Sequence, residues 1–240
     1  MNKVTLCIAL ALIVGQISAQ DHFWDFNEGK GRIAHDQMGV PRGRNKVDAF
    51  LRNAYWETLD IGTAVGITGD DNSYVTFGNY IGQFGRDDFT VAFWVQTKDR
   101  LDLFDLIGNR QSVGHGNFFA VRMTGDGYVT AEVDEDVRGN GYIGVKSKQR
   151  RLNDGEWHHI AVTRNGGKLA LYIDGELSNT GSARSTANIR NRNDFKLGRS
   201  LVDKGTRKFA PSALFDDVSI YSDDLTASQV KSLYRSGLNN

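Results

Sequence analysis

The sequence predicts an all-β protein, a two-sheet antiparallel jelly-roll sandwich with a short C-terminal helix. Short apolar or alternating runs follow one another from residue 23 to about residue 221, which is the pattern of many antiparallel strands. The 240 residues include 27 glycines and 2 prolines, a balance that favours tight turns over long helices or a disordered tail. The strand–helix–strand rhythm of a parallel sheet is missing, so two packed antiparallel sheets are expected.

Six strands and one helix are the clearest elements. Residues that tolerate positive φ separate several strands, at 124–127, 165–167 and 174–175, and hairpin turns require such residues. We therefore expect consecutive strands to pair. A helix is expected over residues 227–235, with Thr226 as its N-cap and Gly237 at its end. The expected strands are 89–97, 117–123, 128–133, 158–164, 169–173 and 215–221.

The first 19 residues are typical of a secretory signal peptide. Lys3 precedes an apolar run over residues 4–14, and small residues end at Ala19. We expect cleavage after Ala19 and an extracellular domain over residues 20–240. The apolar run is shorter than the roughly 20 residues of a membrane span, so insertion into a membrane is not expected. The one cysteine, Cys7, lies in this leader, so the mature chain should contain no disulfide.

The total charge is balanced, but its distribution is not. Lys and Arg number 29, as do Asp and Glu, so overall charge does not favour nucleic acid or an anionic membrane as partner. Residues 184–208, however, hold eight basic and two acidic side chains. This basic segment could bind a sulfated polysaccharide through its positive charge. The alternative is a pair of solvated loops whose charge only balances the acidic side chains elsewhere in the chain. Its members are Arg184, Arg190, Arg192, Lys196, Arg199, Lys204, Arg207 and Lys208; a second cluster is Lys146, Lys148, Arg150 and Arg151.

Two consecutive motifs, DGEWHHIAVTR over residues 154–164 and KLALYIDG over 168–175, resemble the central hairpin of laminin-G-like, concanavalin-A-like lectin jelly rolls. The same family's other motifs follow its order: WDFNEG at 24–29, DFTVAFWV at 88–95, FKLG at 195–198 and FDDVSIY at 215–221. Asn27 departs from the family, which usually has an acid there. The resemblance implies a secreted or matrix recognition module for glycans, sulfated polysaccharides or protein partners, frequently with calcium. Within the motif we expect Trp157 in the core, with His158 and His159 structural.

Three carboxylates are candidates for a structural Ca²⁺ site. Strand alternation places Asp216 on the face of Val218 and Ile220, which look core-facing. A buried carboxylate needs a partner, and oxygen ligands suit Ca²⁺. Because first and last strands of sandwiches are often neighbours, Asp25 or Glu28 could complete the site, as in some relatives. The alternative is that Asp216 accepts hydrogen bonds from local N–H groups or an arginine.

A second acidic motif raises the question of enzyme activity. Alternation puts Glu132, Asp134 and Asp136 on one face of a strand. Such a row resembles retaining glycosidases of the laminarinase type, in which one carboxylate is the nucleophile and another the general acid. The last acid is Asp136, where that family usually has Glu. The competing interpretation is a solvated strand face opposite Val129, Ala131 and Val133, without catalytic residues.

The sequence therefore favours a secreted, non-catalytic recognition module for carbohydrate or an extracellular-matrix component. Tyr128, Tyr142 and Phe118 are candidates to stack on sugar rings. Two alternatives stay open: a structural matrix protein without a discrete ligand site, and a glycoside hydrolase using Glu132 and Asp136. An open groove at the carboxylates would indicate the hydrolase, and an exposed rim with calcium or basic residues would indicate the recognition module. A large self-complementary surface would indicate the structural protein.

Overall fold

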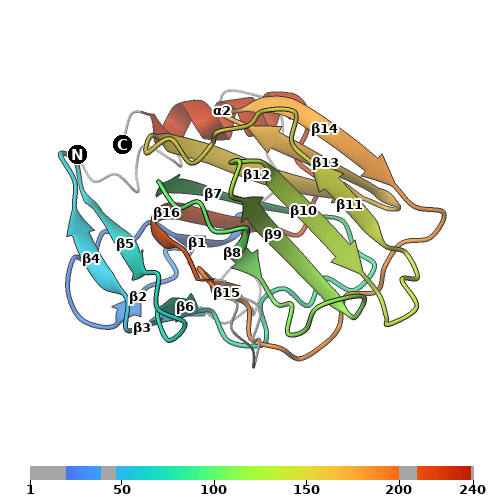
Figure 1. The fold of residues 1–240 in the computed structure, drawn as a ribbon, viewed down its shortest axis with the longest axis horizontal. Coiled ribbons are helices and arrows are strands. Elements are labelled where there is room, and N and C mark those ends of the chain that lie inside the picture. Colours follow the sequence, from blue (N-terminus) through green and yellow to red (C-terminus); the bar gives the residue numbers. More distant parts are fainter. Residues whose placement is uncertain (1–19, 39–46, 200–209, 239–240) are drawn as a thin grey trace.

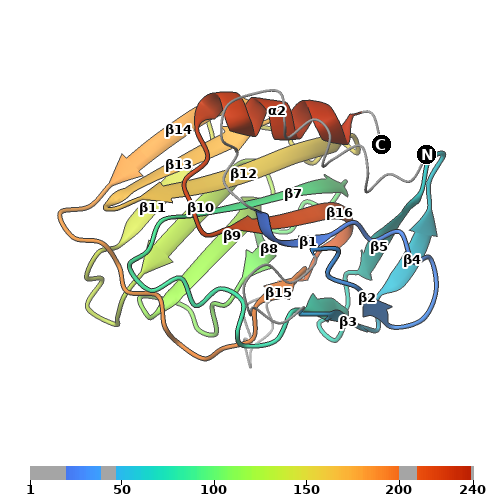
Figure 2. The same ribbon diagram turned by 180° about the vertical axis from the view of Figure 1, so that it is seen from behind.

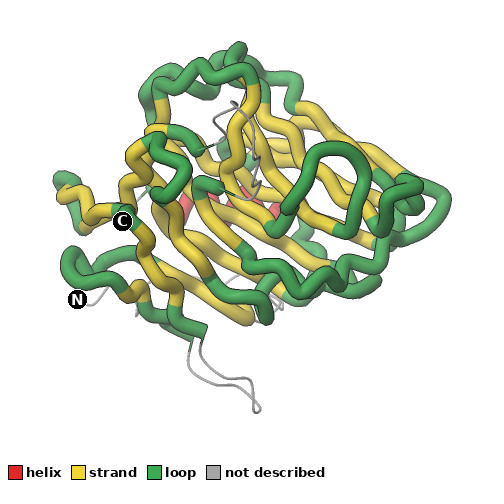
Figure 3. Tube along the Cα trace, turned by 60° about the horizontal axis from the view of Figure 1, so that its bottom comes forward, coloured by secondary structure: helices red, strands yellow, loops and turns green. Residues whose placement is uncertain are grey.

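The structure, a computed structural model, describes residues 20–38, 47–199 and 210–238. Within these ranges two antiparallel sheets of eight strands pack face to face, and one helix, α2, lies on the outer side of one sheet (Figures 1 and 2). Strands dominate the trace, and loops join them at the edges (Figure 3). The predicted sandwich is confirmed. The expected signal peptide, residues 1–19, lies outside the described residues.

The sheet under the helix is named here the β12 sheet. Every hairpin that the sequence predicts by its glycines is present: β9 pairs with β10, β12 with β13, and β13 with β14. The predicted pairing of first and last strands is also found, because β1 pairs with β16. The order of the β12 sheet is β14 (Glu176–Ser182), β13 (Lys168–Ile173), β12 (Trp157–Asn165), β7 (Phe89–Thr97), β16 (Ser212–Tyr221), β5 (Thr63–Thr68) and β4 (Tyr55–Thr58), with β1 (Gln20–Trp24) on β16.

The other sheet is named the β9 sheet. Its outer face is the near face in Figure 1, where β8 to β11 lie side by side. Its order is β11 (Ile143–Lys146), β10 (Val129–Asp134), β9 (Phe118–Thr124), β8 (Leu103–Gly108), β15 (Lys196–Leu197), β6 (Tyr74–Thr76), β3 (Ala49–Arg52) and β2 (Ile33–Ala34).

A row of aromatic rings joins the two sheets in the core. Trp24 packs edge-on against Phe77 at 4.5 Å between centroids, and Phe77 packs similarly against Phe195. Phe195 stacks on Phe119, which meets Phe89 of the β12 sheet at 5.4 Å. All five rings are almost fully buried. Because each aromatic pair adds stability beyond the area it buries, this row stabilises the packing of one sheet on the other.

Helix α2 (Ala227–Gly237) begins as predicted. Thr226 accepts a hydrogen bond from the Gln229 N–H and the Gln229 side chain bonds back to Thr226, which is a full capping box. Val230 is the helix's buried residue, and Tyr234 stacks on Trp94 at 5.5 Å. A lysine–glutamate ion pair, Lys231 to Glu176, joins the helix to β14. The helix therefore covers only part of the β12 sheet.

One core assignment is wrong. Trp157 pairs with Gln96 at the start of β12 and is half-buried. Ile160 and Val162 of the same strand lie in the core. Because side chains alternate along a strand, Trp157 faces outward, together with His159. His159 is indeed structural: it is packed between Trp94 and Tyr234.

Candidate functional site

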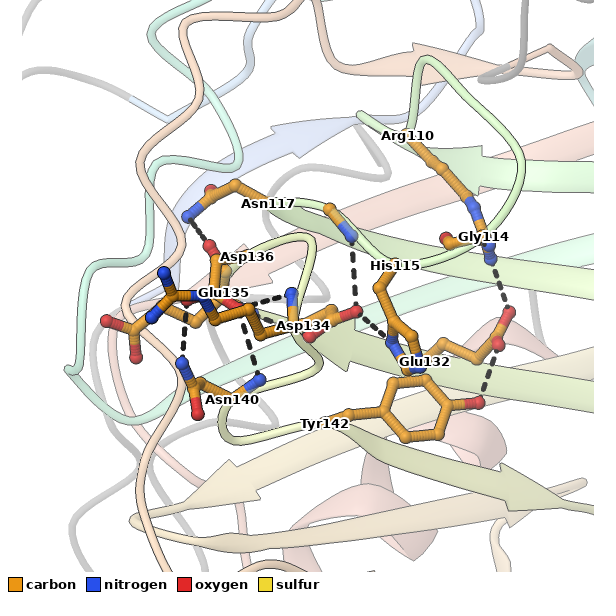
Figure 4. A network of polar contacts seen from close by, with 12 residues as sticks. Arg110, Gly114, His115, Asn117, Glu132, Asp134, Glu135, Asp136, Asn140 and Tyr142 are labelled. Atoms are coloured by element: carbon orange, nitrogen blue, oxygen red, sulfur yellow. Dashed lines mark hydrogen bonds and ion pairs between the residues drawn. The ribbon is translucent and has the colours of Figure 1, made fainter.

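Strand β10 holds the carboxylates that the sequence singled out. Val129, Ala131 and Val133 face the core, so Glu132 and Asp134 lie on the outer face of the β9 sheet. Both are nevertheless buried, at 8% and 0% exposure. The interpretation as a solvated strand face is therefore wrong for these two residues. They are buried because the loop of residues 109–117, between β8 and β9, folds over them (Figure 4).

Two arginines enclose the Glu132 carboxylate. Oε2 accepts from Arg110 Nη1 at 3.0 Å and from Arg122 Nε at 3.0 Å, and Arg122 Nη2 also donates to it. Arg110 is held in turn by the backbone of the loop, since it donates to the carbonyl oxygens of Ser112 at 3.0 Å and Gly114 at 2.6 Å. The two guanidinium groups and the carboxylate form a nearly buried ion-pair cluster, which we call the Glu132 cluster.

Tyr142 forms the exposed border of this cluster. Its hydroxyl donates to Glu132 Oε1 at 2.9 Å, and the hydroxyl end of the ring lies over Gly144, where any Cβ would collide with it. Burial first, and then the charge of Glu132, raise the pKa of Tyr142 to about 12, so the phenol stays protonated and donating at neutral pH. The residue is still 38% exposed, which leaves part of the ring open to a ligand.

Of the three aromatic candidates, Tyr142 is the most accessible. Phe118 is 2% exposed and lies beneath the Arg110 guanidinium, 4.1 Å from its ring centroid. Tyr128 is half-buried, and Lys146 Nζ lies 3.8 Å from its ring centroid. The structure therefore leaves Tyr142 as the ring that a sugar could reach first.

His115 connects the covering loop to β10. Its Nδ1 lies 2.7 Å from Asp134 Oδ2, and the same oxygen accepts from the Gly116 N–H at 3.2 Å. The imidazole meets Tyr142 edge-to-face at 5.1 Å, and a Cβ at Gly139 would collide with it. With its side chain 48% exposed, His115 adds a second ring to the exposed border around Tyr142.

Asp136 does not continue the row of carboxylates. It lies beyond the end of β10, in a turn, and accepts hydrogen bonds from the Arg138 N–H at 2.8 Å and Asn140 Nδ2 at 2.7 Å (Figure 4). The bond from Asn140 is the main cause that lowers the pKa of Asp136. Burial would raise the pKa of Glu132, but the charges of Arg122 and Arg110 outweigh it and lower that pKa. Neither carboxyl group has the raised pKa that a glycosidase's general acid needs.

The structure corrects the expected inward position of Asp216, the candidate calcium ligand. A β-bulge follows Asp216, and Asp217 has a φ of +48°, so Phe215 and Val218 both enter the core. The bulge breaks the alternation on which the inward position of Asp216 rested. Asp216 is half-buried, pairs with Trp94 of β7 and accepts a hydrogen bond from the Asp217 N–H at 2.9 Å.

Asp25 and Glu28 make separate local hydrogen bonds. Asp25 accepts from Gln37 Nε2 at 3.1 Å, and Glu28 accepts from the His35 N–H at 2.7 Å. Among the described residues, His, Cys, Asp and Glu side chains form no group of three or more that could hold a metal ion. The calcium site stays a prediction.

The described members of the basic segment differ in exposure, and the polyanion site stays a prediction. Arg184, Arg190 and Arg192 are exposed in the segment between β14 and β15, where the Arg190 N–H bonds to Asn117 at 2.8 Å. Lys196 is half-buried in β15, its Nζ 5.0 Å from the centroid of the Tyr74 ring, and burial lowers its pKa. Arg199 is half-buried. The remaining members, Lys204, Arg207 and Lys208, lie outside the described residues.

A sequence profile of the laminin G type, described as the concanavalin A-like lectin/glucanases superfamily, matches residues 68–231. The chain belongs to this superfamily. Two curated relatives, from Rattus norvegicus and Mus musculus, are both named Sushi, von Willebrand factor type A, EGF and pentraxin domain-containing protein 1. They are 31% and 30% identical over 154 residues, which is 60% of this chain and 4% of theirs. The chain thus spans a small part of their length.

Solved structures share the superfamily's fold with this chain. The binding domain of Paraclostridial Mosquitocidal Protein 1 has a TM-score of 0.71 at 19% identity, with 92% of this chain and 52% of that chain covered. Domain 4 of AbnA, a GH43 extracellular arabinanase from Geobacillus stearothermophilus, was solved in complex with arabinotriose. Its TM-score is 0.66 at 16% identity, with 91% of this chain and all of that chain covered. At such identities the likeness concerns the fold.

Sequence reasoning missed the partners of the carboxylates of β10. Arg110, Arg122 and His115 were not singled out, because Arg110 and His115 come from the loop of residues 109–117, which returns over the sheet only in three dimensions. Arg122 did carry a signal. It stands on β9 across from Thr130, on the face opposite Val121 and Met123, one strand away from Glu132.

No helix in the described part of the chain is both long and apolar enough to span a bilayer.

Proposed function

We propose that this chain is a secreted, non-catalytic carbohydrate-binding module that binds sugar on the outer face of β9 to β11. The observation that carries the proposal is the accessible Tyr142 ring, fixed at its hydroxyl by Glu132 and bordered by His115. An aromatic face stacks on the C–H face of a sugar ring, while neighbouring polar groups bind its hydroxyls. A ring that is already fixed loses little conformational entropy on binding.

The absence of catalysis is supported by the state of the carboxylates. A retaining glycosidase needs two carboxyl groups about 5–5.5 Å apart, one of them with a raised pKa. Here the pKa values of Glu132 and Asp136 are both lowered, and Asp134 is fully buried against His115. The proposed role of Glu132 is therefore to position Tyr142 and the two arginines.

The choice of ligand has support from a neighbour of the fold. Domain 4 of AbnA was solved with arabinotriose, so a neutral oligosaccharide is the first probe. Sulfated chains are the second probe, since Arg184, Arg190 and Arg192 are exposed. Extracellular location is supported by the signal-peptide-like pattern of residues 1–19, and mass spectrometry of protein secreted by a eukaryotic host should find a chain that begins at Gln20.

The decisive experiment measures binding of arabinotriose and a panel of neutral and sulfated oligosaccharides by isothermal titration calorimetry. We expect Tyr142→Ala to weaken binding of the best ligand at least about tenfold, which corresponds to about 1.4 kcal/mol. Tyr142→Phe should retain most of the affinity because the ring remains. Tyr80→Ala removes a tyrosine that is 86% exposed elsewhere and serves as the matched control.

The remaining parts of the proposal are tested separately. If Ca²⁺ binds the folded state, millimolar Ca²⁺ should raise the thermal midpoint and Asp216→Ala should abolish the rise. Binding of sulfated chains through the basic segment should weaken with salt and with Arg190→Ala. Equal affinity of wild type and Tyr142→Ala for every ligand in the panel, or hydrolysis of the bound sugar, would contradict the central claim.

A further inference from the structure

We propose that a second saccharide site lies on the opposite side of the sandwich, in a groove on the outer face of β12, β13 and β14. The groove is open to solvent and has a volume of about 490 Å³, within the usual range of small-ligand sites. One of its walls is the segment of residues 224–226 that leads into α2; the strands and the helix can be followed in Figure 2. We call it the β13 groove. This site is independent of the Tyr142 site.

The floor of the groove is a cross-strand row with a small residue in its centre. Thr163 of β12 pairs with Ala170 of β13, which pairs with Thr180 of β14. Ala170 is half-buried and packs against the apolar cluster under the helix, which includes Tyr172 and Leu225. The methyl group gives the groove an apolar floor, and a threonine lies on either side of it in the register.

The polar groups of the groove suit a ligand with many hydroxyls. Threonine and tyrosine hydroxyls both donate and accept, and Thr163 shares a hydrogen bond with Tyr172. Asn165 Nδ2 donates to Asp224 Oδ2 at 2.7 Å, and an ionised carboxylate has further acceptor capacity. Lys168, opposite Asn165 in the register, supplies the balancing cation. With one charge of each sign, the groove favours a neutral sugar of one or two rings over an anion.

The wall of the groove is rigid before any ligand arrives. Thr90 of β7 donates to the Asp223 carbonyl at 2.8 Å and accepts from the Leu225 N–H at 2.9 Å. The capping box at Thr226 fixes the next residue. These bonds hold the segment between β16 and α2 against the sheet, so binding does not require the wall to be ordered.

A second site on the other sheet would make the module bivalent. The Tyr142 site lies on the β9 sheet and the β13 groove on the β12 sheet, so the two sites face away from each other. One molecule could then link two glycan chains, and avidity would exceed the affinity of either site.

The test follows backbone amide shifts by NMR in the Tyr142→Ala variant, which removes the first site. Glucose, galactose, arabinose, maltose, cellobiose and lactose are added at millimolar concentration. We expect the amides of Ala170 and Thr180 to shift with at least one of them. Thr180→Trp, at an exposed position, should fill the groove and weaken that response at least about tenfold. Leu177→Trp, on the same strand, exposed and outside the groove, should leave it unchanged.

Each outcome decides between the two sites. Unchanged shifts at Ala170 and Thr180 with all six sugars, or a response that Thr180→Trp leaves intact, would overturn the β13 groove and leave the Tyr142 site standing. Binding of lactose 3-sulfate but not lactose would assign the groove to an anion through Lys168 and equally overturn the proposal. Loss of all wild-type sugar binding in Thr180→Trp but not in Tyr142→Ala would support the groove and remove the Tyr142 site.

Discussion

Two regions of this fold bury arginine, and they satisfy the guanidinium group in different ways. In the Glu132 cluster, two arginines share one carboxylate. Arg164 of β12 is fully buried and instead donates to the backbone carbonyl oxygens of residues 84, 85 and 87, and to that of Ala187 at 3.0 Å. Burial lowers the pKa of Arg164 to about 10, so it remains a cation at neutral pH.

The difference separates a site whose hydrogen-bond acceptor titrates in acid from one whose acceptors do not. A carboxylate can be protonated, whereas the carbonyl oxygens around Arg164 cannot titrate in the acid range. Arg164 joins two loops permanently, since the turn of residues 84–88 and the segment at residue 187 are both fastened to it. The Glu132 cluster supports the exposed Tyr142 border only while its carboxylate is ionised.

The largest effect is expected for Arg164→Met. The substitution leaves several buried carbonyl groups without donors, so the free energy of unfolding should fall by about 3–5 kcal/mol. Urea unfolding followed by tryptophan fluorescence measures it. Arg164→Lys should recover only part of the loss, because an ammonium lacks the planar fork of donors. A loss below about 1 kcal/mol would show that water replaces the guanidinium.

Glu132→Gln should be the next most damaging change. It leaves Arg110 and Arg122 close together with a neutral partner, and we expect a loss of about 2–4 kcal/mol in the free energy of unfolding. The matched control is Asp126→Asn, in the exposed β9–β10 turn, which should stay within about 0.5 kcal/mol of wild type. Equal effects of the two substitutions would contradict the ion-pair cluster.

The contrast should also appear as a pH dependence. The pKa of Glu132 is lowered from its usual 4.5, so its stabilisation is present above about pH 4.5 and is lost as the pH falls through the folded-state pKa. The stability difference between wild type and Glu132→Gln should therefore shrink below about pH 4.5. The difference between wild type and Arg164→Met should change less there, because the hydrogen bonds of Arg164 go to backbone carbonyl oxygens and the carboxylates of Asp88 and Asp87 act on it only through their charge. Paired urea titrations across the acid range distinguish the two.

The smallest effect is expected for Tyr142→Phe. Loss of the hydroxyl leaves Glu132 Oε1 with one donor fewer, at a cost of about 0.5–1.5 kcal/mol. Ultraviolet titration of the tyrosines should at the same time lose a group that ionises near pH 12. If that late-titrating group persists in the variant, it belongs to another tyrosine.

The overall architecture could be predicted because the signals that set it are local. The apolar run of β7, the alternation along β10, the glycines in the hairpin turns and Thr226 before α2 each act within a few residues, and all were found where expected. Alternation with Ile160 and Val162 also predicts the outward position of Trp157. The expectation that Trp157 lies in the core came from the family motif instead.

The candidate site depended on contacts between segments distant in sequence. Glu132 is buried because Arg110 returns over it from a loop 22 positions earlier, and nothing in the sequence near residue 132 indicates this. Asp216 was misplaced for a different reason. Its strand contains a bulge, and Asp217 there has a positive φ. A glycine at this position would have indicated a bulge in the sequence, whereas an aspartate does not.

The position of β16 has a consequence for synthesis of the chain. β16 is inserted between β5 and β7 and also carries β1. During translation, those three strands expose unpaired edges until residues 212–221 have left the ribosome. Exposed edges recruit other strands, so nascent chains should be aggregation-prone until late, and chaperones that cover sheet edges should raise the yield of folded protein. Truncation before residue 212 should yield an aggregate rather than a smaller sandwich.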